Sequence, residues 1–235
     1  MTDLFHAAKR ADHEAARQLL PLLSSGETIT RRHLNQAMTA AYGGSDAEGR
    51  WTQRESFEIL EHALALPIRA SNLALTSFDD VRPIISLVTR LPTQTVRSEE
   101  QIEWQQFSTP VDIAAVAMLL ANVQPDDVIL EPSAGNGLLV AQLGAHLALH
   151  LNELDPARRG RLVDVFPAAS VTGHDGATLN SSLAAIERPT LIIMNPPFSR
   201  SLGRGADDFA AVRHLQAALR RLRPGGRLVA IMPDW

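Results

Sequence analysis

Apolar residues recur every three or four positions through the first third of the chain, and this spacing predicts helices. Serine, threonine and glycine at the ends of the apolar stretches mark where each helix begins and ends. The four predicted helices are a first one stopped by Pro21 and the cluster 24–26, a second from Thr30 to Gly43, a third over about residues 52–66, and a short fourth one capped by Ser77 and Asp80.

The pattern changes after Pro110, where short apolar runs alternate with amphipathic stretches. Buried strands that alternate with helices predict a parallel, doubly wound α/β sheet with helices on both faces. We predict a helical N-terminal domain over 1–91, a linker over 92–109 and a sheet domain over 110–235. The predicted strands are 128–130, 147–151, 168–171, 191–194 and 227–232, and the predicted helical segments are 137–145, 156–165, 179–186 and 206–222.

Composition excludes several classes of protein. The 235 residues contain no cysteine, so no disulfide and no thiolate metal site is expected. His146 and His150 have no third ligand near them in the sequence, and we expect no metal. No apolar run approaches the roughly 18 residues of a membrane span, and the start has no signal-peptide pattern, so the chain is expected to be soluble and cytoplasmic, with no membrane partner.

Charge restricts where a nucleic acid could bind. The chain has 22 basic and 26 acidic residues, a net charge of −4, so no overall positive field attracts nucleic acid. The last part of the chain differs, since seven arginines and three aspartates follow Asn195. We expect any nucleic-acid surface to be local, with Arg200 and Arg204 as the best candidates for phosphate contacts.

The turn after the first predicted strand has the composition of a ligand-binding loop. Glu131 ends the strand, and Gly135 and Gly137 follow in a run of small residues before the next helical segment. Glycine lets the backbone approach a ligand closely. The dinucleotide fingerprint G-x-G-x-x-G fails because Val140 occupies its third glycine position. The carboxylate of Glu131 instead suits a positively charged ligand that carries an amine.

Acidic residues also follow the next two predicted strands. Glu153 is placed to accept both hydroxyls of a ribose, and Asp175 could accept from an adenine amino group. Because the carboxyl ends of parallel strands meet at one edge of the sheet, we expect these side chains to share a site. Together with Glu131 they describe a ligand made of a nucleoside and an amino acid, and we predict S-adenosylmethionine as the cofactor.

The fourth predicted strand ends in Asn195-Pro196-Pro197-Phe198. The prolines fix the backbone, so the Asn195 amide oxygen and the Pro196 carbonyl are expected to point at one place. Two such acceptors suit a planar NH₂ group, whose nitrogen could then attack a methyl sulfonium without a general base. Phe198 would stack on a base that has left its duplex.

These residues carry a family resemblance over about 101–235. The segment resembles S-adenosylmethionine-dependent N6-adenine DNA methyltransferases of class I, with a Rossmann-like fold, because Gln106–Pro110, Glu131–Gly137 and Asn195–Phe198 match their motifs. The resemblance implies that Asn195, Pro196, Pro197 and Phe198 are catalytic. It also implies a cofactor site made of Phe107, Ser108, Thr109, Pro110, Glu131, Pro132, Ser133, Ala134, Gly135, Gly137, Glu153, Leu154, Asp175, Gly176 and Asn195.

The N-terminal part also resembles known proteins. The segments 45–51 and 91–100 are similar to the opening of methylase–helicase fusion proteins of mobile elements, which carry a strawberry-notch-like helicase. This resemblance implies DNA as a partner, further C-terminal domains for target recognition and unwinding, and a role in restriction-modification or antirestriction. The sheet domain is accordingly expected to lack its last strands.

Three alternatives remain open from the sequence. One is a methyltransferase of a glutamine amide in release factors, which uses a similar tetrapeptide but a different first motif. A second is an rRNA amino-methyltransferase. The third, from another class, is a non-catalytic module that binds cofactor or DNA within a larger helicase assembly.

Overall fold

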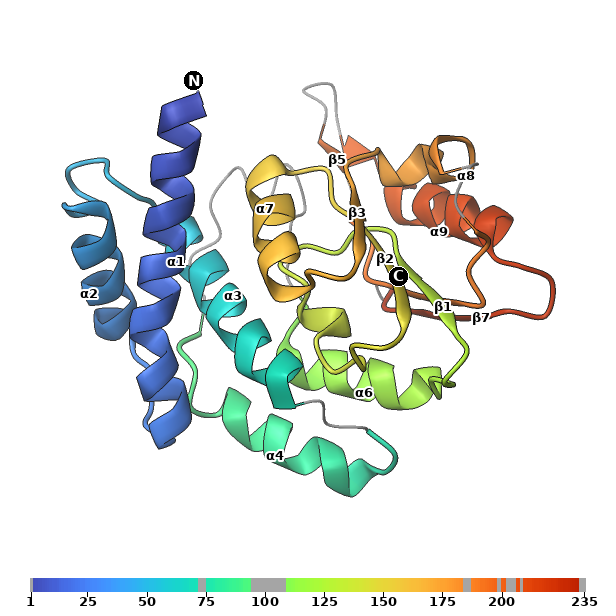
Figure 1. Cartoon of the computed structure of the whole chain (residues 1–235), viewed down its shortest axis with the longest axis horizontal. Coiled ribbons are helices and arrows are strands. Elements are labelled where there is room, and N and C mark those ends of the chain that lie inside the picture. Colours follow the sequence, from blue (N-terminus) through green and yellow to red (C-terminus); the bar gives the residue numbers. More distant parts are fainter. Residues whose placement is uncertain are drawn as a thin grey trace.

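The centre of the structure is a five-stranded sheet in which all neighbouring strands are parallel, in the order β3-β2-β1-β4-β7 (Figure 1). The strands are β1 (Val128–Glu131), β2 (Ala148–Asn152), β3 (Ser170–Thr172), β4 (Leu191–Met194) and β7 (Arg227–Ala230). This computed structural model describes residues 2–71, 75–93, 109–183, 187–197, 200–201, 206–207 and 209–232. The parallel α/β sheet predicted from the sequence is confirmed.

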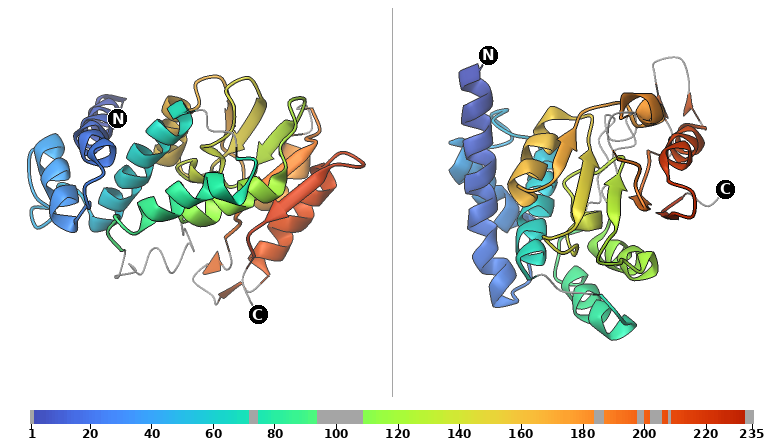
Figure 2. Two further views of the ribbon diagram at one scale, coloured as in Figure 1. Left: turned by 90° about the horizontal axis from the view of Figure 1, so that it is seen from below. Right: turned by 45° about the vertical axis from the view of Figure 1, so that its right-hand side comes forward.

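Helices cover both faces of this sheet (Figure 2). Ile129 and Ile193 point into a core shared with one set of helices, whereas Leu130 and Ile192 belong to a second apolar cluster on the opposite face. Such alternation is expected of strands that are buried on both sides. The helical elements of this half are α6 (Val111–Ala121), η1 (Leu138–Val140), α7 (Pro156–Val165), η2 (Gly176–Thr178), α8 (Leu179–Ser182) and α9 (Ala210–Arg221), and a short hairpin is formed by β5 (Arg200–Ser201) and β6 (Ala206–Asp207).

Four helices precede α6 in the described part of the chain. They are α1 (Thr2–Ser25), α2 (Arg31–Tyr42), α3 (Gln53–Ser71) and α4 (Phe78–Val88). Helix α3 packs against α7 and η1, and α4 packs against α6, so the apolar core runs without a break from Ala15 to Ile193. No helix among the described residues is both long enough and apolar enough to cross a membrane.

The predicted ends of these helices are confirmed where capping residues set them. Thr30 caps α2 and accepts from His33 N–H, and Gly43 ends the helix with φ +69°. Ser77 and Asp80 form the predicted box at the start of α4. Helix α1 ends at Ser25, within the predicted cluster 24–26, but the prediction that Pro21 helps to stop it is wrong, because the helix continues through that proline. Helix α3 likewise runs beyond its predicted end, through Pro67.

The predictions for the sheet half need three corrections. The segment 137–145 forms only the short turn η1, and the apolar spacing that suggested a helix reflects the burial of all side chains over 138–143. The segment 206–222 begins with β6 before α9 starts at Ala210. Helix α6 was not predicted at all. Helix α8 has four residues and belongs to the predicted segment 179–186, the end of which lies outside the described residues.

A buried ion network joins the two parts of the chain. Glu58 of α3 contacts Arg158 and Arg161 of α7, at 2.8 Å in each case, and Arg161 also contacts Asp12 of α1 at 2.9 Å. Burial of Glu58 raises the pKa of its carboxyl, but the two guanidinium groups outweigh this effect and lower the pKa to about 2. The carboxylate is therefore charged and held between α3 and α7.

Candidate cofactor and catalytic site

The first strand ends in a carboxyl group that is completely buried. Glu131 accepts a hydrogen bond from Ser133 N–H through Oε1, at 3.2 Å, but Oε2 has no hydrogen-bond partner among the described residues. Burial raises the pKa of Glu131 well above its ordinary value, and the nearby Glu153 carboxylate raises it further. An unpartnered buried acceptor is costly, so a bound ammonium group would stabilise it. The amino group of S-adenosylmethionine is such an ammonium group, so Glu131 fits this cofactor.

The two glycines of the β1 turn have different surroundings. Both have positive φ, +56° for Gly135 and +86° for Gly137, which favours glycine. A Cβ at Gly135 would meet no heavy atom within 4 Å, so this backbone faces open space. A Cβ at Gly137 would lie 2.5 Å from the ring of Phe166. Packing against Phe166 is therefore enough to require glycine at position 137. At position 135 there is room for a ligand beside the backbone.

Glu153, just after β2, links two strand ends. Its Oε2 accepts from Gly135 N–H and its Oε1 from Asp155 N–H, both at 2.8 Å. Burial raises the pKa of this carboxyl, although the nearby Arg158 and the two N–H donors act in the opposite direction. Each carboxylate oxygen can accept a second hydrogen bond. Leu154, the next residue along the chain, is exposed.

Asn152, a residue to which the sequence assigned no role, fixes the same edge of the sheet. Asn152, at the end of β2, donates through Nδ2 to the carbonyls of Pro132, at 3.0 Å, and His174, at 2.8 Å. Its Oδ1 accepts from the Thr172 hydroxyl and from His174 N–H, both at 2.9 Å. One buried amide therefore connects the ends of β1, β2 and β3.

The third strand end carries the predicted Asp175. Its Oδ1 accepts from Ala177 N–H at 3.0 Å and so caps η2. Oδ1 also lies 4.0 Å from Nε2 of His214 on α9. The neighbouring Gly176 has no room for a side chain, because a Cβ there would lie 2.5 Å from the His214 ring. The side chain of Asp175 is 38% exposed and remains accessible to a ligand.

The fourth strand end brings two predicted residues into contact. Asn195 donates through Nδ2 to the Thr109 hydroxyl at 3.0 Å, although 86 positions separate the two. This bond leaves Oδ1 of Asn195 buried and without a partner among the described residues. Pro196 is buried, Pro197 is half-buried, and Pro110 occupies the cap position before α6. Thr109 thus orients the amide of Asn195.

Four other predicted residues cannot be placed in the site. Phe107, Ser108, Phe198 and Arg204 lie outside the described residues. The backbone of Arg200 lies opposite that of Asp207 in the β5–β6 hairpin. Their roles stay predictions. The predicted residues Pro132, Ser133 and Ala134 form the β1 turn, where Ala134 N–H donates to the Asn152 carbonyl at 2.9 Å.

Comparison with known proteins gives short or distant similarities. No protein-family model matches the chain. Ribosomal RNA small subunit methyltransferase A of Chromobacterium violaceum is 33% identical over 99 residues, which make up 41% of this chain and 38% of that protein. The chain thus matches about two fifths of the length of this curated relative.

Two solved structures are also similar. TrmN from Thermus thermophilus has a TM-score of 0.45 and 18% identity, over 60% of this chain and 47% of that one. A Listeria monocytogenes protein, described as a candidate class I S-adenosylmethionine-dependent methyltransferase, has a TM-score of 0.47 and 14% identity, over 100% of this chain and 75% of that one.

Proposed function

We propose that the chain is the core of an S-adenosylmethionine-dependent methyltransferase that acts on an exocyclic amino group. The observation that carries this proposal is a pair of buried acceptors on adjacent strands that have no hydrogen-bond partner in the described part of the chain, Oε2 of Glu131 at the end of β1 and Oδ1 of Asn195 just after β4. The first suits the ammonium group of the cofactor, and the second suits the amine that receives the methyl group. The 33% identical methyltransferase segment supports the same reaction class.

The residues of this chain divide the work between binding and catalysis. When bound, S-adenosylmethionine supplies a methyl group on a positively charged sulfur. Glu131 and Glu153 hold its amino-acid and ribose ends, and Asp175 accepts from its adenine. Asn195 accepts a hydrogen bond from the target amine, which favours the nitrogen lone pair needed for attack. As the N–CH₃ bond forms, the electrons of the S–CH₃ bond return to sulfur, and the nitrogen then loses a proton to solvent.

Within this class, we propose the N6 amino group of adenine in DNA as the target. The tetrapeptide Asn195–Phe198 resembles the catalytic motif of N6-adenine DNA methyltransferases. We also propose further domains of the same polypeptide, for target recognition and unwinding, because segments 45–51 and 91–100 resemble methylase–helicase fusion proteins. The same resemblance suggests a role in modification or antirestriction. RNA is the second candidate substrate, because the curated relative is named for ribosomal RNA.

The proposal is tested by transfer of labelled methyl groups to DNA, small-subunit rRNA and a release factor in parallel. We expect label in DNA, recovered as N6-methyladenine by nucleoside mass spectrometry, and no label with Asn195→Ala. Label in rRNA alone would show that the substrate is RNA and not DNA. Label in the release factor alone would show that the substrate is a protein. Cofactor binding without transfer to any substrate would identify a non-catalytic module, and absence of binding would overturn the proposal.

A further inference from the structure

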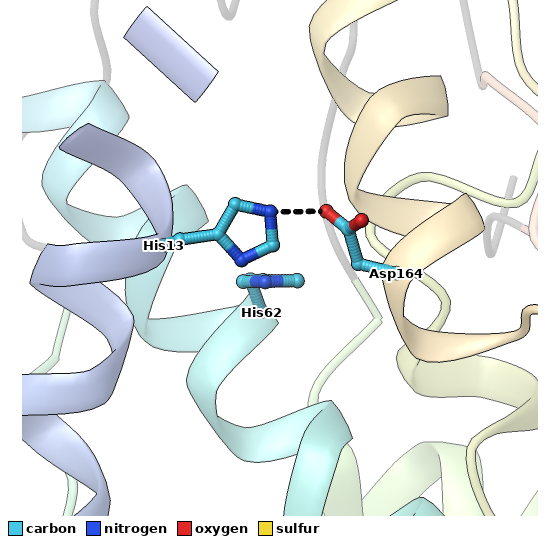
Figure 3. A group of neighbouring side chains, drawn as sticks. All are labelled: His13, His62 and Asp164. Carbon is cyan, nitrogen blue, oxygen red and sulfur yellow. Dashed lines mark ion pairs between the residues drawn. The ribbon is translucent and has the colours of Figure 1, made fainter. Parts of the chain in front are cut away.

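Three side chains from distant parts of the sequence meet on the side of the sheet where the N-terminal helices pack. His13 of α1, His62 of α3 and Asp164 of α7 each offer one possible ligand atom, and all these atoms lie within 4.8 Å of one another. Nε2 of His13 lies 2.8 Å from Oδ2 of Asp164, and the two imidazole rings are 5.8 Å apart between centroids. Figure 3 shows the three side chains pointing toward one another from their helices.

His62 is the most buried member of the cluster. The residue is 1% exposed, and its Nδ1 has no hydrogen-bond partner among the described residues. Burial, followed by the nearby Arg161, lowers the pKa of His62 to about 4, so the ring is neutral at physiological pH. A neutral imidazole is the form that binds metal ions. A buried nitrogen left unpaired costs free energy, which a metal ion would recover.

The positive charge that acts on the cluster is balanced by carboxylates. Arg161, which lowers the pKa of His62, is held by Asp12 and Glu58 at 2.9 and 2.8 Å. Asp164 supplies a negative charge directly to the cluster, and its side chain is 20% exposed. The side chain of His13 is 41% exposed, so the cluster opens to solvent on the α1 side. An ion can therefore enter, and water can complete its coordination.

We propose that His13, His62 and Asp164 form a binding site for a divalent transition cation, with Zn²⁺ as the best match. Two imidazoles and one carboxylate are ligands that Zn²⁺ accepts, with a water as the fourth ligand. Tetrahedral coordination with Zn–N bonds of about 2.0–2.1 Å sets ligand atoms about 3.3 Å apart. Because no separation exceeds 4.8 Å, the ligand atoms need to approach by about 1.5 Å at most, which side-chain rotation can supply.

Such an ion would join three helices that no covalent link connects. The chain contains no cysteine, so no disulfide holds α1 or α3 to the sheet. One ion bound to α1, α3 and α7 would stabilise their packing, because a cation that binds only the folded chain adds its binding free energy to stability. This structural role is independent of the proposed methyl transfer, since none of the three residues belongs to the candidate cofactor site.

The test is titration of the chelator-treated full chain with Zn²⁺ against a chromophoric competitor, with Mg²⁺ in parallel. We expect one equivalent of Zn²⁺ to bind, and no comparable binding of Mg²⁺, which prefers oxygen ligands. His62→Gln and Asp164→Asn should each weaken binding by more than about 10–100-fold, the loss typical of removing only an outer partner of a ligand. Free Zn²⁺ at about 100 times its Kd should raise the Tm by about 5–10 °C.

The control is His146→Gln, which removes an exposed histidine outside the cluster and should leave Zn²⁺ binding unchanged. Co²⁺ gives a second readout, since its visible absorption should indicate tetrahedral coordination in the wild type and disappear in the Asp164→Asn variant. If His62→Gln fails to fold, His13→Gln and Asp164→Asn still test Zn²⁺ binding. Both residues are partly exposed, so we expect these variants to fold. Absence of Zn²⁺ binding, or binding that these variants leave intact, would overturn the proposal.

Discussion

The Glu61 carboxylate on α3 accepts a hydrogen bond from Asn136 Nδ2 at 2.6 Å, and Arg161 donates to the other end of the same amide at 3.1 Å. Asn136 lies between Gly135 and Gly137, in the turn that we assign to the cofactor. The N-terminal helices therefore do more than cover the sheet. They position the backbone of the candidate cofactor site.

This coupling leads to a prediction about a fragment that contains only residues 92–235. Removal of the helices would expose one side of the continuous core and would leave Asn136 and the α7 arginines without Glu61 and Glu58. We expect the fragment to unfold without cooperativity or to aggregate, as seen in calorimetry and near-UV circular dichroism. A soluble fragment that unfolds cooperatively and binds cofactor would instead establish the division into domains at residues 91–110.

The pKa of Glu58 predicts a pH dependence of stability. The pKa is about 2 in the folded chain and about 4.5 when the group is free, so the charged carboxylate stabilises the fold fully above about pH 4.5. This contribution is lost as the pH falls from about 4.5 to about 2. Because removal of one member of a buried ion pair costs about 3–5 kcal/mol, Glu58→Gln should lower the free energy of unfolding by that amount near neutral pH.

Urea denaturation of both proteins at several pH values measures this effect. The difference between wild type and Glu58→Gln should shrink toward low pH, since the protonated carboxyl then resembles the amide. Glu14→Gln is the control, because Glu14 is exposed and contacts Arg17 and Gln18 on the surface of the same helix, so about 0–1 kcal/mol is expected. A difference that stays constant with pH would show that Glu58 does not contribute through its charge.

The two glycines of the β1 turn provide a matched pair of variants. Gly135→Ala should cost about 1–2 kcal/mol of stability, the cost of a positive φ, because its Cβ meets open space. Gly137→Ala should cost about 1–3 kcal/mol more, since its Cβ collides with Phe166. If the cofactor lies against Gly135, Gly135→Ala should also weaken cofactor binding by about tenfold, or 1.4 kcal/mol. Equal stability losses in the two variants would contradict the assigned surroundings.

Two variants of Glu153 separate its proposed contact with the ribose from its hydrogen bond with Gly135 N–H. Glu153→Ala should weaken binding of S-adenosylmethionine by about 1.5–3 kcal/mol, because ribose hydroxyls and the Gly135 N–H would lose their acceptor. Glu153→Gln keeps one acceptor oxygen for Gly135 and should lose less. Calorimetric titration measures both, with the exposed Glu187→Ala as control. Wild-type affinity in Glu153→Ala would remove this residue from the cofactor site.

Asn195 and Thr109 test the catalytic proposal. Asn195→Ala removes an acceptor aimed at the reacting amine and should slow single-turnover methyl transfer by about 10²–10³-fold. Thr109→Val leaves the amide in place without its hydroxyl partner, so the loss should be smaller. Both variants should still fold, which circular dichroism checks. Transfer at the wild-type rate by Asn195→Ala would refute the role of its amide oxygen.

The sequence predicted those elements whose limits depend on local chemistry. Four apolar residues between Thr190 and Asn195 were enough to predict β4 at its observed bounds, and Thr30 and Gly43 delimited α2. Helical periodicity gave wrong predictions where a segment is buried on all sides and has no polar face. Helix α6 is apolar almost throughout and has no amphipathic period, and the fully buried segment 138–143 could not be distinguished from a helix.

The same limit applies to the site. That Glu131, Glu153, Asp175 and Asn195 lie at neighbouring strand ends could be predicted, because parallel strands bring their ends to one edge, whereas their roles stay predictions. Contacts between distant helices leave no periodic signal. The bonds of Asn136 to Glu61 and of Arg158 to Glu58 join positions 75 and 100 residues apart, and the cluster of His13, His62 and Asp164 spans three helices. Only the folded chain reveals such partners.

The hydrogen bonds of Asn152 have a thermodynamic consequence for binding. Because both ends of its amide are occupied, the loops after three strands are held in place before any ligand arrives. A preorganised edge loses little conformational entropy on association, so more of the contact energy appears as affinity. In this fold, affinity for a ligand can thus depend on a side chain buried behind the surface that receives it.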